Sequence, residues 1–280
     1  MNSFKIKSYA KINLALNVVS RKHSLHKIES IVSFLDLHDE ILIKKIKNKN
    51  HKIKFTGKFS NNIRSKNTVS QLLKNIDKKK LLKDKFQILI KKNIPSEAGL
   101  GGGSMNAASI LNFLIKKKLI RLKKKEIIEI SNSIGSDVIL GIYSKNLILG
   151  SNNLIKILPI KKKIYTLIVK PNFGCSTKNI YSKVKRFSKP RFNITSKHMF
   201  STKFLKKMKN DLESIALNKY PKLVTLKKFL EKLSKIEFVR MTGSGSAIIA
   251  YFNSNKKCKE AEKKVKRQFK NYWCKTSKTI

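Results

Sequence analysis

The stretch Pro95–Ser109, P-S-E-A-G-L-G-G-G-S-M-N-A-A-S, places four of the chain's 11 glycines within five residues. Residues 86–90 before it alternate in the manner of a strand, and residues 107–115 after it carry apolar side chains at helical spacing. Ser104 stands where the N-cap of that helix is expected. The pattern predicts a strand, a glycine loop and a helix. Backbone N–H groups in such a loop, at the positive end of a helix, favour a phosphate as ligand.

Two common phosphate loops do not fit this stretch. The P-loop signature requires a lysine that is absent here. The dinucleotide fingerprint requires a third glycine where Ser104 stands, and an acidic residue about 20 positions further on, which is also absent. A tight strand-to-helix turn without any ligand is the alternative, but one glycine would be enough for such a turn.

The pattern P-x-x-x-G-L-G-G-G-S-x-N-A-A resembles the phosphate-binding signature of the GHMP small-molecule kinases. The resemblance implies that the loop holds the phosphates of ATP, supplied as a co-substrate with Mg²⁺, and it implies no metal ligand among the side chains. Glu97 stands where the family has further glycine, so its carboxylate should point outward or be offset by nearby lysines. The implied ATP-binding residues are Pro95, Ser96, Glu97, Ala98, Gly99, Leu100, Gly101, Gly102, Gly103, Ser104 and Met105.

Two further segments carry the chemistry that the resemblance implies. S-Y-A-K-I-N is similar to the family's opening strand, in which Lys11 would lie near the transferred phosphoryl group and Asn13 near the substrate. Both side chains share one face of the predicted strand and could instead simply face water. G-S-D-V resembles a family motif whose Asp faces the substrate hydroxyl, which would make Asp137 the general base and Lys11 its partner. In isolation, Asp137 could equally be a helix cap.

The segment Arg21–His26 resembles the branch of the family whose substrate is a cytidine diphosphate-linked methylerythritol. His26 matches the family's His, whereas Leu25 replaces an expected Tyr and His23-Ser24 replaces Asp-Gly. Tyr181 occupies the place of a second aromatic side chain on the cytosine. The implied reaction is phosphorylation of one hydroxyl of that substrate, giving the 2-phosphate, in isoprenoid precursor biosynthesis. Another GHMP kinase, of the homoserine or mevalonate type, is the nearest alternative.

M-T-G-S-G-S resembles the third kinase motif, a glycine turn that closes over phosphates and substrate, with Thr242 and Gly243 on the substrate. Asn210-Asp211-Leu212-Glu213 is similar to the family's N-D-L-E. We expect this second segment to cap and position a helix rather than to react.

The formal net charge of +48 suggests a nucleic-acid or anionic-membrane partner. Only seven of the 64 basic residues are Arg, however, and the lysines are spread along the chain. We therefore interpret them as a solvated surface, and a basic nucleic-acid-binding module remains the distant alternative. The expected partner is a small molecule, with no nucleic acid and no membrane, for a monomer or a homodimer.

The composition, 41% hydrophobic over 280 residues, allows a real core. Three widely spaced cysteines argue against a disulfide framework and a zinc site. The chain lacks an apolar run of about 18 residues, and its N-terminus lacks a signal-peptide core, so the cytoplasm is the expected location.

The elements alternate in a way that predicts an α+β fold. The resemblance implies a two-domain GHMP kinase, with a ribosomal-S5-like N-terminal domain over residues 1–158 and a ferredoxin-like C-terminal domain over residues 159–280. We expect strands at 4–19, 86–94, 165–170 and 247–252, two strands within 28–46, further strands within 142–157, and helices at 67–76, 123–133, 223–233 and 256–269.

Overall fold

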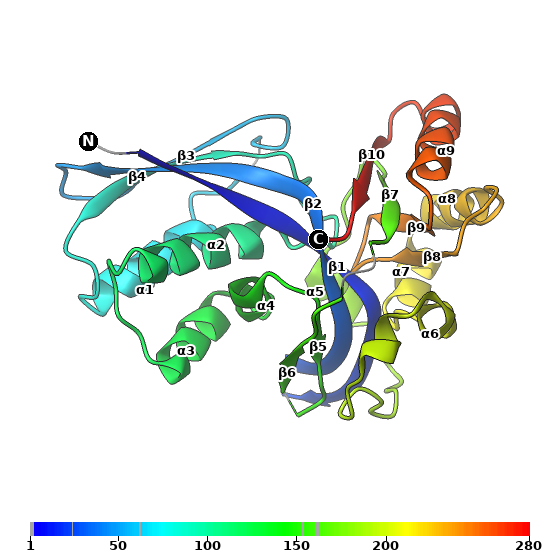
Figure 1. The fold of residues 1–280 in the computed structure, drawn as a ribbon, viewed down its shortest axis with the longest axis horizontal. Helices are drawn as coiled ribbons and strands as arrows, with labels where there is room; N and C mark the ends of the chain where they lie inside the picture. Colours follow the sequence, from blue (N-terminus) through cyan, green and yellow to red (C-terminus); the bar gives the residue numbers. More distant parts are fainter. Residues whose placement is uncertain (1–2, 24, 62, 153, 161–162) are drawn as a thin grey trace. The chain divides into compact units, whose positions relative to one another are not determined.

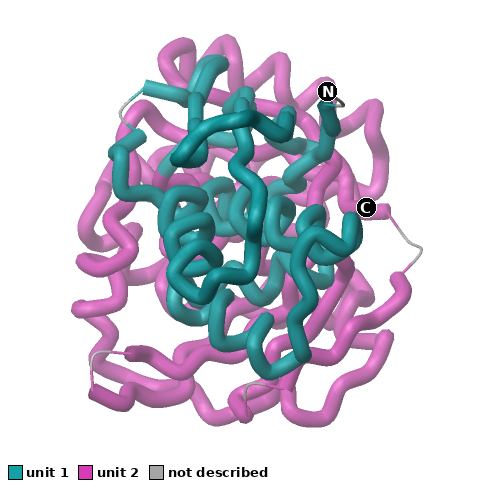
Figure 2. Tube along the Cα trace, turned by 90° about the vertical axis from the view of Figure 1, so that its left-hand side faces the viewer, with its two compact units in different colours: residues 1–11, 37–96, 101–144 teal, residues 12–36, 97–100, 145–280 magenta. Residues whose placement is uncertain are grey.

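The computed structural model describes residues 3–23, 25–61, 63–152, 154–160 and 163–280. Figure 2 shows two compact units that interleave along the chain. Unit 1 comprises residues 1–11, 37–96 and 101–144, and unit 2 comprises residues 12–36, 97–100 and 145–280. They interleave because the strands β1 (Ser3–Lys22) and β2 (Leu25–Ile46) are long enough to contribute to both. The domain boundary expected between residues 158 and 159 stays a prediction.

Unit 1 is a sheet covered on one face by helices (Figure 1). In the sheet, β3 (Lys52–Thr56) runs parallel to β4 (Lys85–Lys91), and β4 pairs antiparallel with residues 40–46 of β2. The covering helices are α1 (Thr68–Lys78), α2 (Gly102–Lys116), α3 (Lys124–Ile134) and α4 (Val138–Tyr143). Because side chains alternate along a strand, Ile88 and Ile90 of β4 both enter the core, where they join Leu72 of α1 and Leu111 of α2.

The helices expected at 67–76 and 123–133 are confirmed as α1 and α3. Asn67 caps α1, since its side-chain oxygen accepts hydrogen bonds from the N–H groups of Val69 and Ser70. In α3, Ile130 is buried, whereas Ile128 is 37% exposed.

The expectation of two strands within residues 28–46 is wrong, because β2 runs through His38 and Asp39 without a break. The Asp39 carboxylate is fully buried and accepts hydrogen bonds from the Lys92 ammonium and from the N–H groups of Asn93 and Ile94. Because these donors satisfy the buried carboxylate of Asp39, the chain does not need a turn at this point to bring the carboxylate to solvent.

Unit 2 contains a four-stranded antiparallel sheet in the order β10-β7-β9-β8. Helices α8 and α9 pack on it, and their apolar side chains share a core with Leu167 and Val169. The chain order βαββαβ is the ferredoxin-like motif, as expected. Its elements are β7 (Tyr165–Lys170), α8 (Pro221–Glu231), β8 (Phe238–Met241), β9 (Ile248–Phe252), α9 (Asn255–Gln268) and β10 (Trp273–Lys278).

The rest of unit 2 consists of short elements. β5 (Leu147–Leu149) pairs with residues 30–32 of β2 and with β6 (Ile155–Ile157). β5 and β6 are the strands expected within 142–157, and they begin after α4, which continues to Tyr143. The short helices are α5 (Thr177–Tyr181), the 3-10 helix η1 (Lys197–Phe200), α6 (Thr202–Lys207) and α7 (Glu213–Lys219).

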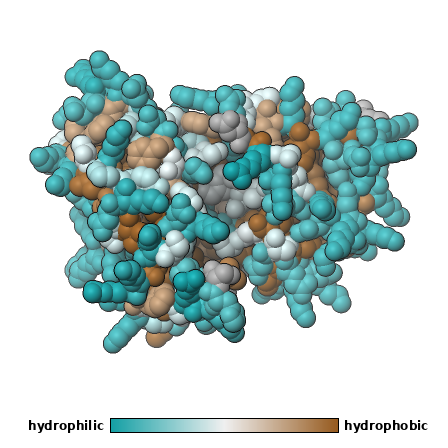
Figure 3. Space-filling view, turned by 180° about the vertical axis from the view of Figure 1, so that it is seen from behind, coloured by the Kyte–Doolittle hydropathy of each residue, from teal (hydrophilic) through white to brown (hydrophobic). Residues whose placement is uncertain are grey.

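Hydrophilic side chains cover much of the face drawn in Figure 3, as expected for lysines spread along the chain. Cys175, Cys258 and Cys274 are buried and free. Across the described ranges, no helix has both the length and the apolar character that a membrane crossing requires.

Candidate active site

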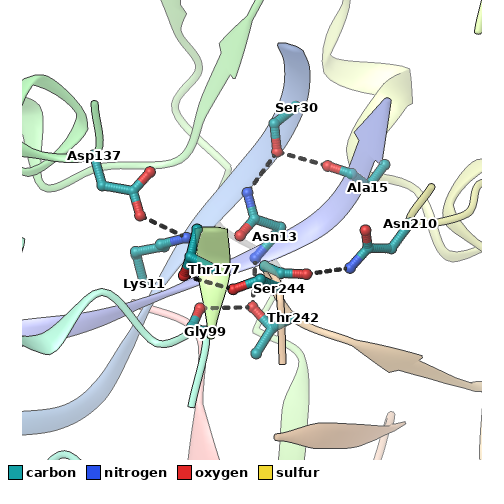
Figure 4. A network of polar contacts seen from close by, with 11 residues as sticks. Lys11, Asn13, Ala15, Ser30, Gly99, Asp137, Thr177, Asn210, Thr242 and Ser244 are labelled. Atoms are coloured by element: carbon teal, nitrogen blue, oxygen red, sulfur yellow. Dashed lines mark hydrogen bonds and ion pairs between the residues drawn. The ribbon is translucent and has the colours of Figure 1, made fainter. Parts of the chain in front are cut away.

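Lys11 and Asp137 form an ion pair within unit 1 (Figure 4). Lys11 Nζ lies 3.0 Å from Asp137 Oδ2, and the side chains are 4% and 29% exposed. Asp137 occupies the N-cap position of α4, yet its side chain makes no capping hydrogen bond. The carboxylate is thus directed at Lys11 and partly open to solvent, which does not fit the helix-cap alternative.

The end of the glycine loop lies against this pair. Gly101 is the N-cap of α2, with a left-handed φ of 70°. An ideal Cβ on Gly101 would stand 2.8 Å from Cγ of Lys11, so the absence of a side chain lets the lysine stem pass. The expectation that Ser104 is the N-cap of α2 is therefore wrong. Gly101 can turn the chain into the helix three residues earlier.

The start of α2 offers donors for an anion. The first N–H groups of a helix, here those of Gly102, Gly103 and Ser104, have no acceptor within the helix. They carry the positive end of the helix dipole. Unit 1 thus brings an anion-binding helix terminus and the Lys11–Asp137 pair together through Gly101.

Several of the residues expected to bind ATP have buried side chains, so only their backbone groups are placed to contact the nucleotide. The side chains of Pro95, Ala98, Leu100 and Met105 are buried, and Leu100 and Met105 are each 1% exposed. Ser96 and Glu97 are exposed, and Ser104 is partly buried. Their roles in nucleotide binding stay predictions.

Residues 97–100 of the loop belong to unit 2, where they contact the turn Thr242–Ser246. Thr242 Oγ1 donates to the carbonyl of Gly99 at 3.2 Å, and Ser246 N donates to the carbonyl of Glu97 at 3.0 Å. An ideal Cβ on Gly99 would overlap the Thr242 carbonyl, so only glycine permits this approach. The second and third motifs of the sequence are therefore in direct contact.

Asn13 is held inside unit 2 rather than facing water. Its backbone N–H donates to Thr242 Oγ1 at 3.0 Å, and its side-chain amide donates to Ser30 Oγ at 2.8 Å (Figure 4). Asn13 is 2% exposed. With Lys11 also buried, the alternative in which both side chains face water is wrong.

Glu97 lies against the segment that follows β7. Its backbone has a φ of 50°, and a Cβ on Gly174 would overlap its carboxylate, which therefore rests on Gly174. The half-buried Lys170 ammonium donates to the carbonyls of Pro171 and Phe173. Burial lowers the pKa of Lys170, and the negative charge of Glu97 opposes that shift. Lys170 thus provides the counter-charge expected for a carboxylate in this loop.

His26 and Tyr181 meet in unit 2, with ring centroids 5.1 Å apart and an angle of 43° between the rings. The buried Nε2 atom of His26 has no hydrogen-bond partner among the described residues. Burial and the nearby Arg21 guanidinium lower the pKa of His26. Leu25 is 77% exposed, and Ser24 lies outside the described residues. The two rings provide an aromatic surface that Leu25 does not extend.

Two charged residues near the loop could not be identified from the sequence. Asp39 and Lys92 form a buried ion pair in unit 1, and the Lys92 ammonium would stand 3.3 Å from a Cβ on Gly102. Both are ordinary charged residues within strand-like segments, so nothing local distinguishes them from solvent-exposed neighbours.

The comparisons with known proteins agree with this geometry. The GHMP kinases N terminal domain matches residues 67–145, and the GHMP kinases C terminal domain matches residues 200–271. The chain is 59% identical to a 4-diphosphocytidyl-2-C-methyl-D-erythritol kinase of Pelagibacter ubique, with 100% of both chains covered. It is 33% identical to an enzyme of the same name from Clostridium tetani, covering 99% of this chain and 100% of the relative.

Solved structures share the fold. A crystal structure of 4-(cytidine 5'-diphospho)-2C-methyl-D-erythritol kinase matches with a TM-score of 0.79 at 21% identity, over 98% of this chain and 99% of that one. Homoserine kinase from Cytophaga hutchinsonii matches with a TM-score of 0.72 at 17% identity, over 100% and 95%. Since both domains match in order and a relative is similar along its whole length, the chain belongs to the GHMP kinases, in the family of the 4-diphosphocytidyl-2-C-methyl-D-erythritol kinases.

Proposed function

We propose that this chain transfers the γ-phosphoryl group of ATP to a hydroxyl of 4-diphosphocytidyl-2-C-methyl-D-erythritol, giving the 2-phosphate in isoprenoid precursor biosynthesis. The observation that carries the proposal is the Lys11–Asp137 ion pair beside the start of α2. The relative that is 59% identical carries the name of this kinase, which supports the choice of substrate.

The Lys11–Asp137 pair supplies the two functions that phosphoryl transfer requires from the protein. Asp137 accepts the hydroxyl proton while the hydroxyl oxygen bonds to the γ-phosphorus and the bond to the β–γ bridging oxygen breaks, releasing ADP. Lys11 stabilises the charge that spreads over the transferred group. Positioning of both side chains contributes much of the rate enhancement, and Gly101 helps by leaving room for the lysine stem.

ATP binds through its phosphates at the N–H groups of the glycine loop and of the first turn of α2. Mg²⁺ accompanies the nucleotide and neutralises phosphate charge. Among the residues that the structure describes, no three His, Cys, Asp or Glu side chains gather as a metal cluster.

The cytidine end of the substrate binds at His26 and Tyr181. Their rings form an aromatic surface for a base, and the buried Nε2 atom of His26 has no hydrogen-bond partner among the described residues. Homoserine and mevalonate have no ring that would use such a surface, so this contact favours the cytidine substrate. A cytoplasmic location, a monomer or homodimer, and the absence of a nucleic-acid partner stay predictions from the sequence.

The test is turnover of a panel of acceptors. The purified chain is supplied with ATP and Mg²⁺ and with the cytidine substrate, homoserine or mevalonate, and ADP release and the mass of the product are measured. We expect kcat/KM to be highest for the cytidine substrate, by about two orders of magnitude or more over the others. A higher kcat/KM for homoserine or mevalonate would identify that compound as the substrate in place of the cytidine compound. The absence of turnover with every acceptor would overturn the proposal.

A further inference from the structure

Asn210 is a buried amide that lies directly behind the glycine turn of the third motif. It is 4% exposed and precedes α7 in unit 2. Its side-chain nitrogen donates hydrogen bonds to the carbonyls of Met241 at 2.9 Å and of Gly243 at 2.7 Å. Figure 4 shows Asn210 directed at this turn, between the ends of β8 and β9. Asn210 therefore holds the carbonyl groups on both sides of Thr242.

The turn that Asn210 holds is connected to residues of the proposed active site. Thr242 Oγ1 accepts a hydrogen bond from Asn13 N and donates one to the carbonyl of Gly99. A Cβ on Gly243 would stand 3.1 Å from Cα of Gly99, so the two backbones are in contact. A shift of this turn would therefore move residues 97–100 of the phosphate loop and the backbone of Asn13 together.

The side chain of Asn210 also has an ordinary structural use. Its oxygen accepts a hydrogen bond from Leu212 N at 3.0 Å, close to the start of α7. Leu212 is the N-cap of α7, so this hydrogen bond fixes the turn that leads into the helix, a positioning role that the N-D-L-E segment suggests. The oxygen acts on the helix and the nitrogen acts on the turn, so substitutions can separate the two roles.

We propose that Asn210 is a positioning residue of the phosphotransferase site, acting through its two hydrogen bonds to the Thr242–Gly243 turn. This inference rests on the proposed function. When the amide nitrogen is removed, two buried carbonyls lose a donor, and the turn no longer has a fixed position against Gly99. Because Asn210 touches neither substrate, its effect reaches the reaction only through the turn and the phosphate loop.

The decisive variant is Asn210→Asp, which has nearly the same shape and keeps an acceptor for Leu212 N. Asp and Asn side chains accept about equally well from a backbone N–H near a helix start, so a residue that serves only the start of α7 would tolerate this change. The carboxylate, however, places an acceptor against two carbonyl oxygens. We expect kcat to fall and KM for ATP to rise in Asn210→Asp, with kcat/KM for ATP lower by about tenfold or more, the scale of one or two lost buried hydrogen bonds.

Asp211→Ala is the matched control. The Asp211 carboxylate accepts hydrogen bonds from Val18 N at 2.8 Å and from Ser188 Oγ at 2.7 Å, and among the described residues its hydrogen bonds do not reach the turn. This variant should lose stability comparably to Asn210→Asp while kcat and KM for ATP stay near those of the parent chain. Equal losses of kcat/KM in both variants would identify a general structural effect and would contradict the proposal.

A second measurement keeps the inference testable if the parent chain turns over no acceptor, an outcome that would overturn the proposed function alone. Hydrogen–deuterium exchange of the parent chain, Asn210→Asp and Asp211→Ala is compared at residues 242–247 and in α7. We expect faster exchange at residues 242–247 in Asn210→Asp only, with α7 unchanged. Unchanged exchange in this turn, or acceleration confined to α7, would show that Asn210 serves only the start of α7 and would overturn the inference.

Discussion

The ammonium group of Lys11 lies 3.0 Å from the carboxylate of Asp137, and the lysine stem passes over Gly101 at the start of α2. The proposed base for the hydroxyl, the proposed cation for the phosphoryl group and the start of a helix thus lie together in unit 1. Each of these parts is common in proteins by itself. Their combination is what the chemistry of phosphoryl transfer requires.

Replacing Gly101 should disturb both the loop and Lys11. Gly101→Ala puts a Cβ on a residue with a φ of 70° and places it 2.8 Å from Lys11 Cγ. We expect a loss of unfolding free energy of about 1–2 kcal/mol from the left-handed backbone, together with a lower kcat. Denaturant unfolding and steady-state kinetics measure the two effects.

Gly135→Ala is the stability control for this change, because Gly135 has an extended φ of 169° and its nearest neighbour would be 3.8 Å from a new Cβ. It should unfold nearly like the parent chain. If Gly101→Ala were as stable as Gly135→Ala and as active as the parent chain, the packing described around Lys11 would be wrong.

Tyr181→Ala should weaken binding of the cytidine substrate alone. The ring lies 5.1 Å from that of His26, and one base–aromatic contact is worth about 1–3 kcal/mol. We expect KM for the cytidine substrate to rise about tenfold while KM for ATP changes little. Tyr181→Phe keeps the ring and should stay close to the parent chain. A rise in both Michaelis constants would point to a collapse of unit 2 rather than to lost stacking.

Glu97→Gln should bind ATP more tightly than the parent chain. It removes a negative charge from the phosphate loop and leaves the shape of the side chain in place. Since Glu97 is exposed and has Lys170 as a counter-charge, screening limits the gain to about twofold to fivefold in KM for ATP. An increase in KM would mean that the carboxylate contributes to nucleotide binding.

The three cysteines should be unreactive in the folded chain. Burial raises the pKa of Cys175 and Cys274 to about 11 and that of Cys258 to about 12. At pH 8 a thiol reagent should therefore titrate none of them until denaturant is added, when all three should react. Reaction of one thiol before denaturant is added would show that this cysteine is not buried in the folded chain.

The same shifts predict how stability depends on pH. Above the ordinary thiol pKa of 9.0, the cysteines ionise in the unfolded chain, whereas the buried thiols stay protonated until about 11 or higher. The folded state then binds more protons than the unfolded one, so the unfolding free energy should fall as the pH rises above 9. Replacing Cys258 with Ala should make this decline less steep, and an unchanged slope would contradict the assignment.

Local patterns predicted much of this fold. Strand β7 spans Tyr165–Lys170 as expected, because a short apolar run bounded by polar residues is typical of a buried strand. The strand, glycine loop and helix around Pro95–Ser109 also formed as expected. The short strand β8 and the polar strand β10 were missed, because four residues and a W-C-K-T-S-K pattern carry too little periodicity.

Other features could not be predicted because they depend on a partner that is distant in the sequence. β2 continues through Asp39 because donors at Lys92, Asn93 and Ile94 satisfy the carboxylate. The two hydrogen bonds of Asn210 could not be predicted either, since their acceptors are backbone carbonyls that any sequence would supply. The family resemblance led us to expect Lys11 and Asp137 to be partners, and the structure places the ammonium of Lys11 3.0 Å from the carboxylate of Asp137.

The central claim is that Lys11 and Asp137 act as one unit in phosphoryl transfer. Its most direct test is the turnover number of Asp137→Asn, Lys11→Met and the double variant with the cytidine substrate and ATP. We predict that Asp137→Asn lowers kcat by about two orders of magnitude or more while both substrates still bind. The double variant should be little slower than the slower single variant. Turnover by Asp137→Asn near that of the parent chain, or losses that simply multiply in the double variant, would contradict the account.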